Sequence, residues 1–337
     1  MQLNQRWYRV HYALCPHGQR AFFLQKERDR MINTPMDILE LFPVRKTGKQ
    51  KQAFRSAVKD YAEKLGYSVA VEKGSFGAMN IVIGDPDSAK YLVTAHYDTP
   101  ARMLFPNFIT PCNFAVYLAY QILIVLLFFV AAFVVSFVVT LATGLEELAF
   151  FSAYISYFGL LFLMMFGPAN RHNYNDNTSG VITLLEIACT MPKHLRRKVC
   201  FVLFDLEEAG LIGSASYRKA HKHATANQIV LNLDCVGDGN EIVMFPNKLL
   251  KGNAKYMDRL DSICGQFGER KLVLHRKGFA ICPSDSSNFP LGVGIMAFKR
   301  KKLIGLYCDR IHTERDTILE QTNINILRSA LITLICQ

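Results

Sequence analysis

The chain has 337 residues, half of them hydrophobic, and a formal net charge of +11 at pH 7. This length allows one globular domain of ~250 residues together with additional segments. The positive charge suggests nucleic acid as a partner, but the chain has no recognisable nucleic-acid motif, so we expect none. Its nine cysteines are odd in number and form no Cys-x-x-Cys pair, which argues against a disulfide framework and favours a reducing compartment.

Residues 1–37 form a basic extension for which the sequence predicts no element. Apolar residues at helical spacing over Lys49–Leu65 predict a helix that ends at Gly66. Short apolar runs then predict strands at 68–72, 79–83 and 91–95. The last of these strands delivers His96 to its carboxyl end.

Residues 104–169 interrupt this pattern with two apolar stretches. Residues 114–142 contain 29 residues without a charge, and residues 148–169 contain 22 more. About 20 apolar residues cross a bilayer as a helix, so each stretch is long enough. The polar linker 143–147 suits a tight turn between them. The alternative is a pair of buried core helices or an apolar lid. A soluble insertion would need polar faces, which these stretches almost entirely lack, so the sequence predicts a transmembrane hairpin.

After the insertion, strands again alternate with helices. Helices are predicted at 179–190, 252–267 and 322–335, and strands at 198–204, 229–233, 241–245, 271–275 and 294–298. This alternation predicts an α/β fold of three layers, in which a mixed, mostly parallel sheet is flanked by helices. The hairpin divides this domain into residues 38–103 and 170–337.

The adjacent carboxylates Glu207 and Glu208 follow the central predicted strand. Neighbouring side chains diverge in an extended loop, so one glutamate can bind a metal while the other faces the metal's water. Further candidate ligands lie near strand ends or in polar loops, where α/β folds collect their chemistry. They are His96, Asp176, Asp234 and His312.

These residues lie in motifs that resemble the M28 family of zinc aminopeptidases. The motifs are His96-Tyr97-Asp98-Thr99, Asn175 to Gly180, Glu207 to Tyr217, Asn232-Leu233-Asp234, Ser284-Asp285, and His312-Thr313 with Asp316-Thr317. The resemblance covers roughly residues 38–100 and 170–335. It departs from the family in the eighty positions that separate His96 from Asp176, where relatives have a short loop.

The resemblance implies two Zn²⁺ ions bridged by Asp176, although cobalt or manganese also suits such ligands. It assigns His96 and Asp234 to one metal and Glu208 with His312 to the other. Asp98 is expected to orient the His96 imidazole by a hydrogen bond. Glu207 is expected to act as general base toward a metal-bound water, which is the nucleophile.

Two positions depart from the family pattern. Many relatives carry an aromatic residue before the final histidine, where its hydroxyl stabilises an oxyanion, and this chain has Ile311. Tyr307 or Arg310 could supply that donor instead. Ser284 and Asp285 are expected to shape the substrate pocket, together with those two residues.

Flanking charge predicts the topology. Basic residues such as Arg102 and Arg171 lie beside the spans, whereas the turn offers Glu146 and Glu147, so the positive-inside rule places the catalytic domain and both termini in the cytoplasm. We expect the lipid bilayer as a partner and basic runs against anionic headgroups. Small residues of the first span allow homo-oligomer formation.

The sequence therefore predicts a membrane-anchored metallopeptidase, a hydrolase that removes N-terminal residues from peptides with a free N-terminus near the cytoplasmic membrane face. A glutaminyl-cyclase-like acyltransferase on the same fold is one alternative, and a non-catalytic membrane scaffold is another. All predicted ligands are present, which argues against the scaffold.

Overall fold

The computed structural model describes residues 31–337. Residues 1–30 of the predicted N-terminal extension lie outside this range. The described chain begins with a 3₁₀ turn, Pro35–Asp37, and the short helix α2, Ile38–Leu41. Helix α3, Gly48–Lys64, follows with Thr47 as its N-cap, whose hydroxyl accepts a hydrogen bond from the Gln50 backbone N–H.

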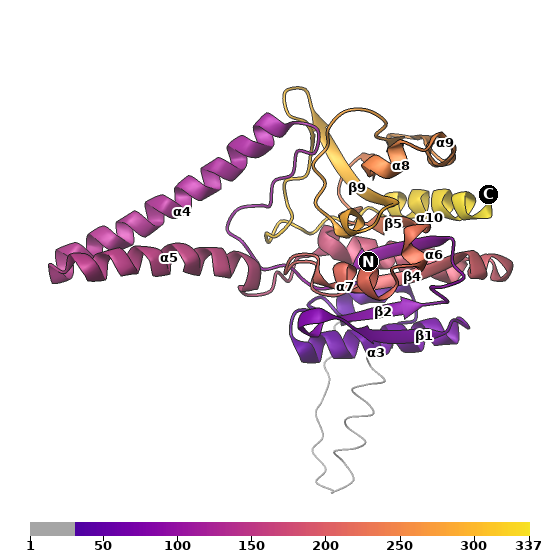
Figure 1. Ribbon diagram of the computed structural model, residues 1–337, viewed down its shortest axis with the longest axis horizontal. Coiled ribbons are helices and arrows are strands. Elements are labelled where there is room, and N and C mark those ends of the chain that lie inside the picture. The colour runs from indigo at the N-terminus through magenta and orange to yellow at the C-terminus, as the bar shows by residue number, and fades with distance from the viewer. Residues whose placement is uncertain (1–30) are drawn as a thin grey trace, which may run out of the picture.

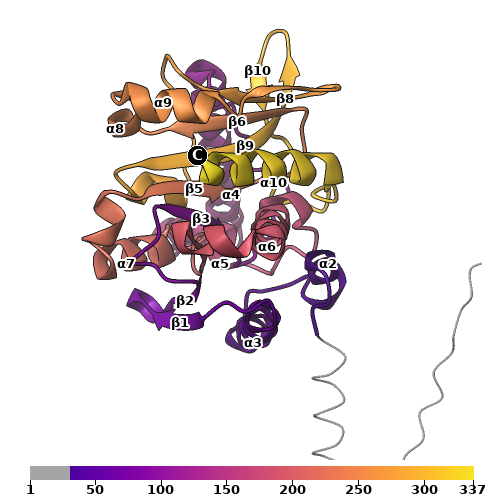
Figure 2. The same cartoon turned by 90° about the vertical axis from the view of Figure 1, so that its right-hand side faces the viewer.

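Ten strands form one sheet in the order β1-β2-β4-β3-β5-β9-β6-β8-β7, and β10 pairs with β9. Figure 2 shows this stack from β1 at the bottom to β8 and β10 at the top. The strands are β1 Val69–Lys73, β2 Met79–Ile83, β3 Tyr91–His96, β4 Val199–Phe204, β5 Ile229–Leu233, β6 Glu241–Pro246, β7 Gly265–Phe267, β8 Arg270–Leu274, β9 Gly292–Lys301 and β10 Gly305–Tyr307.

The sheet is mixed, and the prediction of a mostly parallel sheet is wrong. Strands β4, β3, β5 and β9 are parallel neighbours, and β6 is parallel to β8. The remaining five pairings are antiparallel. The connection between β1 and β2 is a turn of a few residues around Ser75–Gly77, which is too short for the crossover that a parallel pair requires.

Helices cover both faces of the sheet. Alternate side chains of the central strands, such as Val93 and Phe201, pack with α3, α6 (Gly180–Thr190) and α10 (Gln321–Cys336). Their neighbours, such as Leu92 and Val202, form a second cluster on the opposite face with α7 (Ile212–Ala220). This alternation is the two-residue period of a strand buried on both sides.

The helix predicted at 252–267 is shorter than expected. The structure has α8, Lys248–Lys251, then α9, Ala254–Asp261, and the chain enters β7 at Gly265. A glycine destabilises a helix interior, because it loses the most backbone freedom on folding. The edge strand that pairs with β8 therefore replaces the last helical turn.

The inserted segment forms two long helices that project from the domain. Helix α4 spans Phe114–Thr143 and α5 spans Glu146–Phe166, lengths of ~45 and ~31 Å at 1.5 Å per residue. They meet at their distal ends and diverge toward the domain (Figure 1). The left-handed φ of 70° at Gly144 turns the chain between them, and the rings of Phe129 and Tyr157 stack at 4.8 Å.

The apolar side chains of both helices are largely exposed, with Phe133 at 70% and Ile155 at 73%. The alternative of buried core helices is therefore wrong for this chain. Both helices are long and apolar enough to cross a membrane. Ala132, one of the small residues considered for oligomer contacts, is already buried within the hairpin.

Candidate metal centre

Three parallel strands bring candidate ligands to one edge of the sheet. Strand β3 lies between β4 and β5, and it ends at His96. The loop after β4 carries Glu207 and Glu208, and Asp234 directly follows β5. Carboxyl ends of parallel strands lie at the same edge, so residues far apart in sequence converge there.

Asp176 occupies the centre of this group. It lies in the segment Tyr174–Ser179 that leads into α6, where its own backbone is not helical, with φ −112° and ψ 94°. Its Oδ1 is 3.3 Å from His96 Nε2, and its Oδ2 is 3.1 Å from His312 Nε2. The two oxygens of one buried carboxylate thus face two different imidazoles, which is the arrangement that a carboxylate bridging two cations requires.

The remaining carboxylates divide between the two imidazoles. Asp234 Oδ1 is 3.9 Å from His96 Nε2, and Glu208 Oε2 is 3.5 Å from His312 Nε2. Glu207 Oε2 is 4.0 Å from His96 Nε2. Donor atoms of His96, Glu207 and Asp234 lie within 4.8 Å of one another, as do those of His96, Asp176 and Glu208.

The backbone is strained beside these ligands. Leu206, Cys235 and His312 have φ values of 55°, 53° and 65°, in the left-handed region that residues other than glycine rarely adopt. Leu206 precedes the glutamate pair, and Cys235 follows Asp234. Such conformations persist only where the surrounding structure holds them, and they concentrate at functional sites.

The electrostatics of the group favour a cation. Burial and the neighbouring carboxylates raise the pKa values of Glu207 and Glu208 well above the usual range of a glutamate carboxyl. Within the described chain, Glu208 Oε1, His96 Nδ1 and His312 Nδ1 are buried without a hydrogen-bond partner. Buried carboxylates that repel one another are costly unless positive charge compensates them. Mixed nitrogen and oxygen donors of this kind suit divalent transition metals.

One cavity of about 170 Å³ is lined by the six acidic and histidine residues of this group, which are His96, Asp176, Glu207, Glu208, Asp234 and His312. In the described chain no lysine or arginine lines it. The rest of its wall comes from the segment that leads into the hairpin and the start of α4, from the loop after β5, from the loop between β8 and β9, from strand β9 itself, and from the residue before His312. These residues are Asn107, Ile109, Tyr117, Cys235, Pro283, Met296 and Ile311.

The family profile described as Peptidase family M28 matches residues 167–333. Just under half of the chain therefore matches this family, and we call the domain that contains the matched residues the M28 domain. The match begins at the end of the hairpin, so the strand that carries His96 lies before it and joins the M28 domain through its pairing with β4 and β5. No curated protein matches the chain significantly.

Solved structures of low identity share the fold. The LapA aminopeptidase of Legionella pneumophila superposes with a TM-score of 0.53 at 14% identity, over 99% of this chain and 77% of that chain. The glutaminyl cyclase of Porphyromonas gingivalis gives 0.53 at 17% identity, covering 94% and 96%. A Zn-dependent exopeptidase of Parabacteroides distasonis gives 0.52 at 15% identity, covering 94% and 95%.

Two further carboxylates of the M28 domain hold the ligand loops in place. Asp98 Oδ1 lies 3.6 Å from His96 Nδ1, and its two oxygens accept hydrogen bonds from the backbone N–H groups of Glu207 and Glu208 at 3.1 and 3.2 Å. In the same way, the two oxygens of Asp316 accept hydrogen bonds from the backbone N–H groups of Asn175 and Asp176, at 2.8 and 3.1 Å. Asp98 thus contacts the glutamate loop more closely than the imidazole, because its distance of 3.6 Å to His96 Nδ1 is too long for a hydrogen bond.

Replacing Asp98 by Asn is expected to lower metal affinity and turnover by about 10- to 100-fold, the usual loss for a partner outside the ligand set. The amide keeps one oxygen acceptor, but its NH₂ group faces the second backbone N–H. Metal titration of the purified protein measures the effect. Asp85→Asn, on an exposed turn, is the control, and equal metal affinity in both variants would contradict the positioning role.

The predicted substrate-pocket residues lie outside the cavity wall. Arg310 pairs with Asp238 at 3.3 Å, and Tyr307 packs its ring against Phe108. Asp285 is fully buried, both its oxygens lack a partner, and burial raises its pKa to about 7. Ser284 Oγ lies 2.9 Å from Ser286 Oγ.

Sequence reasoning missed three residues near the site. Asn107 and Tyr117 line the cavity from the inserted segment. Arg45 is completely buried beneath it, and its guanidinium donates to the carbonyl of Tyr97 and to Thr178 Oγ1, at 2.6 and 3.0 Å. In the sequence, the only sign of this role is that Arg45 stands just before a predicted helix, and that is a weak signal.

Proposed function

We propose that the protein is a membrane-anchored di-zinc aminopeptidase. The observation that carries this proposal is the position of Asp176, one carboxylate with an oxygen toward each of two histidines. The zinc dependence of the Parabacteroides distasonis exopeptidase, which shares this fold, supports zinc as the metal. His96 and Asp234 would complete one site, and Glu208 and His312 the other, in agreement with the distances above.

Two zinc ions held there would make hydroxide available at neutral pH and polarise a carbonyl. Glu207 lines the same cavity without being needed for either histidine-centred set. Its carboxylate would accept the proton of the attacking water and pass it to the leaving amine. Asp98 would hold the Glu207 loop while this proton moves.

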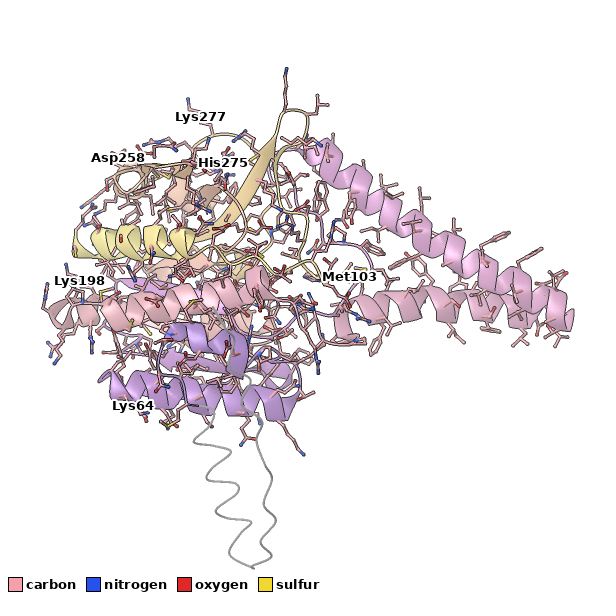
Figure 3. The ribbon with its side chains drawn as sticks, turned by 180° about the vertical axis from the view of Figure 1, so that it is seen from behind. Lys64, Met103, Lys198, Asp258, His275 and Lys277 are labelled. Carbon is pink, nitrogen blue, oxygen red and sulfur yellow. The ribbon has the colours of Figure 1, made fainter. Side chains whose placement is uncertain are left out.

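The apolar hairpin would span the bilayer with the M28 domain on the cytoplasmic side. Met103, which Figure 3 labels at the junction between domain and hairpin, belongs to the segment that enters α4. Basic groups cluster at this junction: Arg102 and Arg171 flank it, and Lys46 Nζ lies 3.4 Å from the Met165 carbonyl. Positive charge on that side is retained in the cytoplasm.

A peptide mixture of which half is N-terminally acetylated tests this function. Detergent-purified protein with zinc is expected to remove N-terminal residues from free-amine peptides only, because an acetylated amine loses its charge and its lone pair. A chelator is expected to abolish the activity and added zinc to restore it. Mass spectrometry of the products measures both effects.

Three outcomes would contradict the proposal in different ways. Equal cleavage of acetylated peptides would indicate another peptidase class. Loss of ammonia from N-terminal Gln alone would establish a cyclase, like the glutaminyl cyclase of Porphyromonas gingivalis that shares this fold. If all peptides remained unchanged, the non-catalytic membrane scaffold would be the remaining alternative.

A further inference from the structure

The segment that enters the hairpin runs along the rim of the cavity. We call residues 101–113 the strap. Its backbone is hydrogen-bonded to the loop that carries the last ligand: the Met103 N–H donates to the His312 carbonyl at 2.7 Å, and the Asn107 N–H donates to the Ile311 carbonyl at 3.2 Å. Ile109 pairs with Cys308 in both directions. The strap is thus part of the site's wall.

Helix α4 holds the strap in this position. The Tyr120 hydroxyl donates to the Pro106 carbonyl at 2.6 Å, and its ring packs against Phe108 with centroids 5.3 Å apart. Phe105 lies against Phe128, about two turns further along the helix than Tyr120, with ring centroids 6.2 Å apart. The first turns of the apolar helix and the strap therefore form one packed unit.

The strap and α4 supply the neutral polar side chains of the cavity. Carboxylates accept hydrogen bonds but do not donate them, and the two imidazoles face the metal centre. Four of the other wall residues are apolar, and the thiol of Cys235 lies within 4.8 Å of carboxylate oxygens of Asp176 and Asp234. This leaves the Asn107 amide and the Tyr117 hydroxyl as the neutral polar groups of the described cavity wall.

Hydrolysis of an amide develops negative charge on the carbonyl oxygen, and donors aimed at that oxygen lower the barrier. We propose that Asn107 and Tyr117 donate hydrogen bonds to the scissile carbonyl, so that the hairpin insertion completes the catalytic site as well as anchoring it. This inference rests on the proposed peptidase function. The side chain of Ile311, which precedes His312, has no hydrogen-bond donor, and Tyr307 and Arg310 lie outside the cavity wall.

Tyr117→Phe removes one hydroxyl and Asn107→Leu removes one amide at similar volume. Each is expected to lower kcat by about 10²- to 10³-fold, the loss measured when one oxyanion donor is removed, with KM within a few-fold of the wild type. Affinity for a phosphinic pseudopeptide, which imitates the tetrahedral state, is expected to fall by a similar factor, while zinc content stays unchanged. Tyr154→Phe, an exposed tyrosine on α5, is the matched control.

Wild-type kcat in both variants would overturn the inference and leave the proposed function intact. A kcat loss that is accompanied by loss of zinc, or that is shared by Tyr154→Phe, would also overturn it, because the residues would then act through folding. A wild-type protein that hydrolyses no peptide would overturn the proposed function, and with it this inference. Measuring the wild type first separates the two failures.

Discussion

Glu207→Gln is expected to lower kcat by about 10²- to 10⁴-fold, the contribution of a positioned general base. Glutamine keeps the length and shape of the side chain but cannot accept a proton at neutral pH. Glu207 is well placed for this role, since its carboxylate lines the cavity 4.0 Å from His96 Nε2 and its backbone is fixed by Asp98. Steady-state kinetics on the best peptide of the library measure the change.

Zinc content decides what the loss means. Glu207 also lies within 4.8 Å of His96 and Asp234, so the structure would allow it to bind metal. If Glu207 is only a general base, the glutamine variant keeps the zinc content of the wild type. If Glu207 is a metal ligand, the variant loses zinc. Reduced zinc in Glu207→Gln would therefore contradict the assignment. Glu186→Gln on helix α6, which breaks a partly buried pair with Arg328, serves as the control and should retain full activity.

The strand ends were predictable because each had a local signal. An apolar run followed at once by His96 or Asp234 indicates both the strand and the chemistry at its end, and the structure has β3 and β5 at these places. Strand direction has no such signal. Antiparallel pairing of β6 with β9 depends on the path of the loops between them, which apolar periodicity does not record.

Contacts between distant segments set the limits of the site prediction. The motifs identified residues of the M28 domain that carry metal-binding groups, since such side chains have a recognisable chemistry. Asn107 and Tyr117 lack that signal, because an amide and a phenol beside an apolar stretch are ordinary at a membrane interface. Only the backbone pairing of the strap with the His312 loop reveals that they reach the cavity.

The insertion also bears on how substrate would reach the proposed metal centre. Its two helices diverge toward the domain (Figure 1), and the strap between their bases forms one wall of the cavity. Leu104 in the strap is 99% exposed, beside the aromatic contact of Phe105 with α4. In a bilayer this rim would contact the interface, so peptides with an apolar segment near their free N-terminus are the substrates that we expect to bind best.

Asp176→Asn is expected to remove both activity and the zinc response of stability. An amide cannot place a negatively charged oxygen on each of two cations, so we expect zinc binding to weaken by more than the about 100-fold typical of partners outside the ligand set. In the wild type, zinc that binds only the folded state should stabilise it by about 2.7 kcal/mol at a concentration of 100 Kd. Thermal unfolding with and without zinc measures this difference.

The variant should also be no more stable than the wild type without metal. Buried Asp176 lies 3.3 Å from His96 Nε2 and 3.1 Å from His312 Nε2, and these imidazoles hold the pKa of its carboxyl below the usual range, so its charge stabilises the folded state. Metal-free Asp176→Asn should therefore unfold at or below the melting temperature of the metal-free wild type. Asp238→Asn is the control, because Asp238 pairs with Lys299 and Arg310 and lies outside the cavity. That control should lose stability yet keep its zinc response. An equal zinc shift in Asp176→Asn and the wild type would show that Asp176 does not bridge the metals.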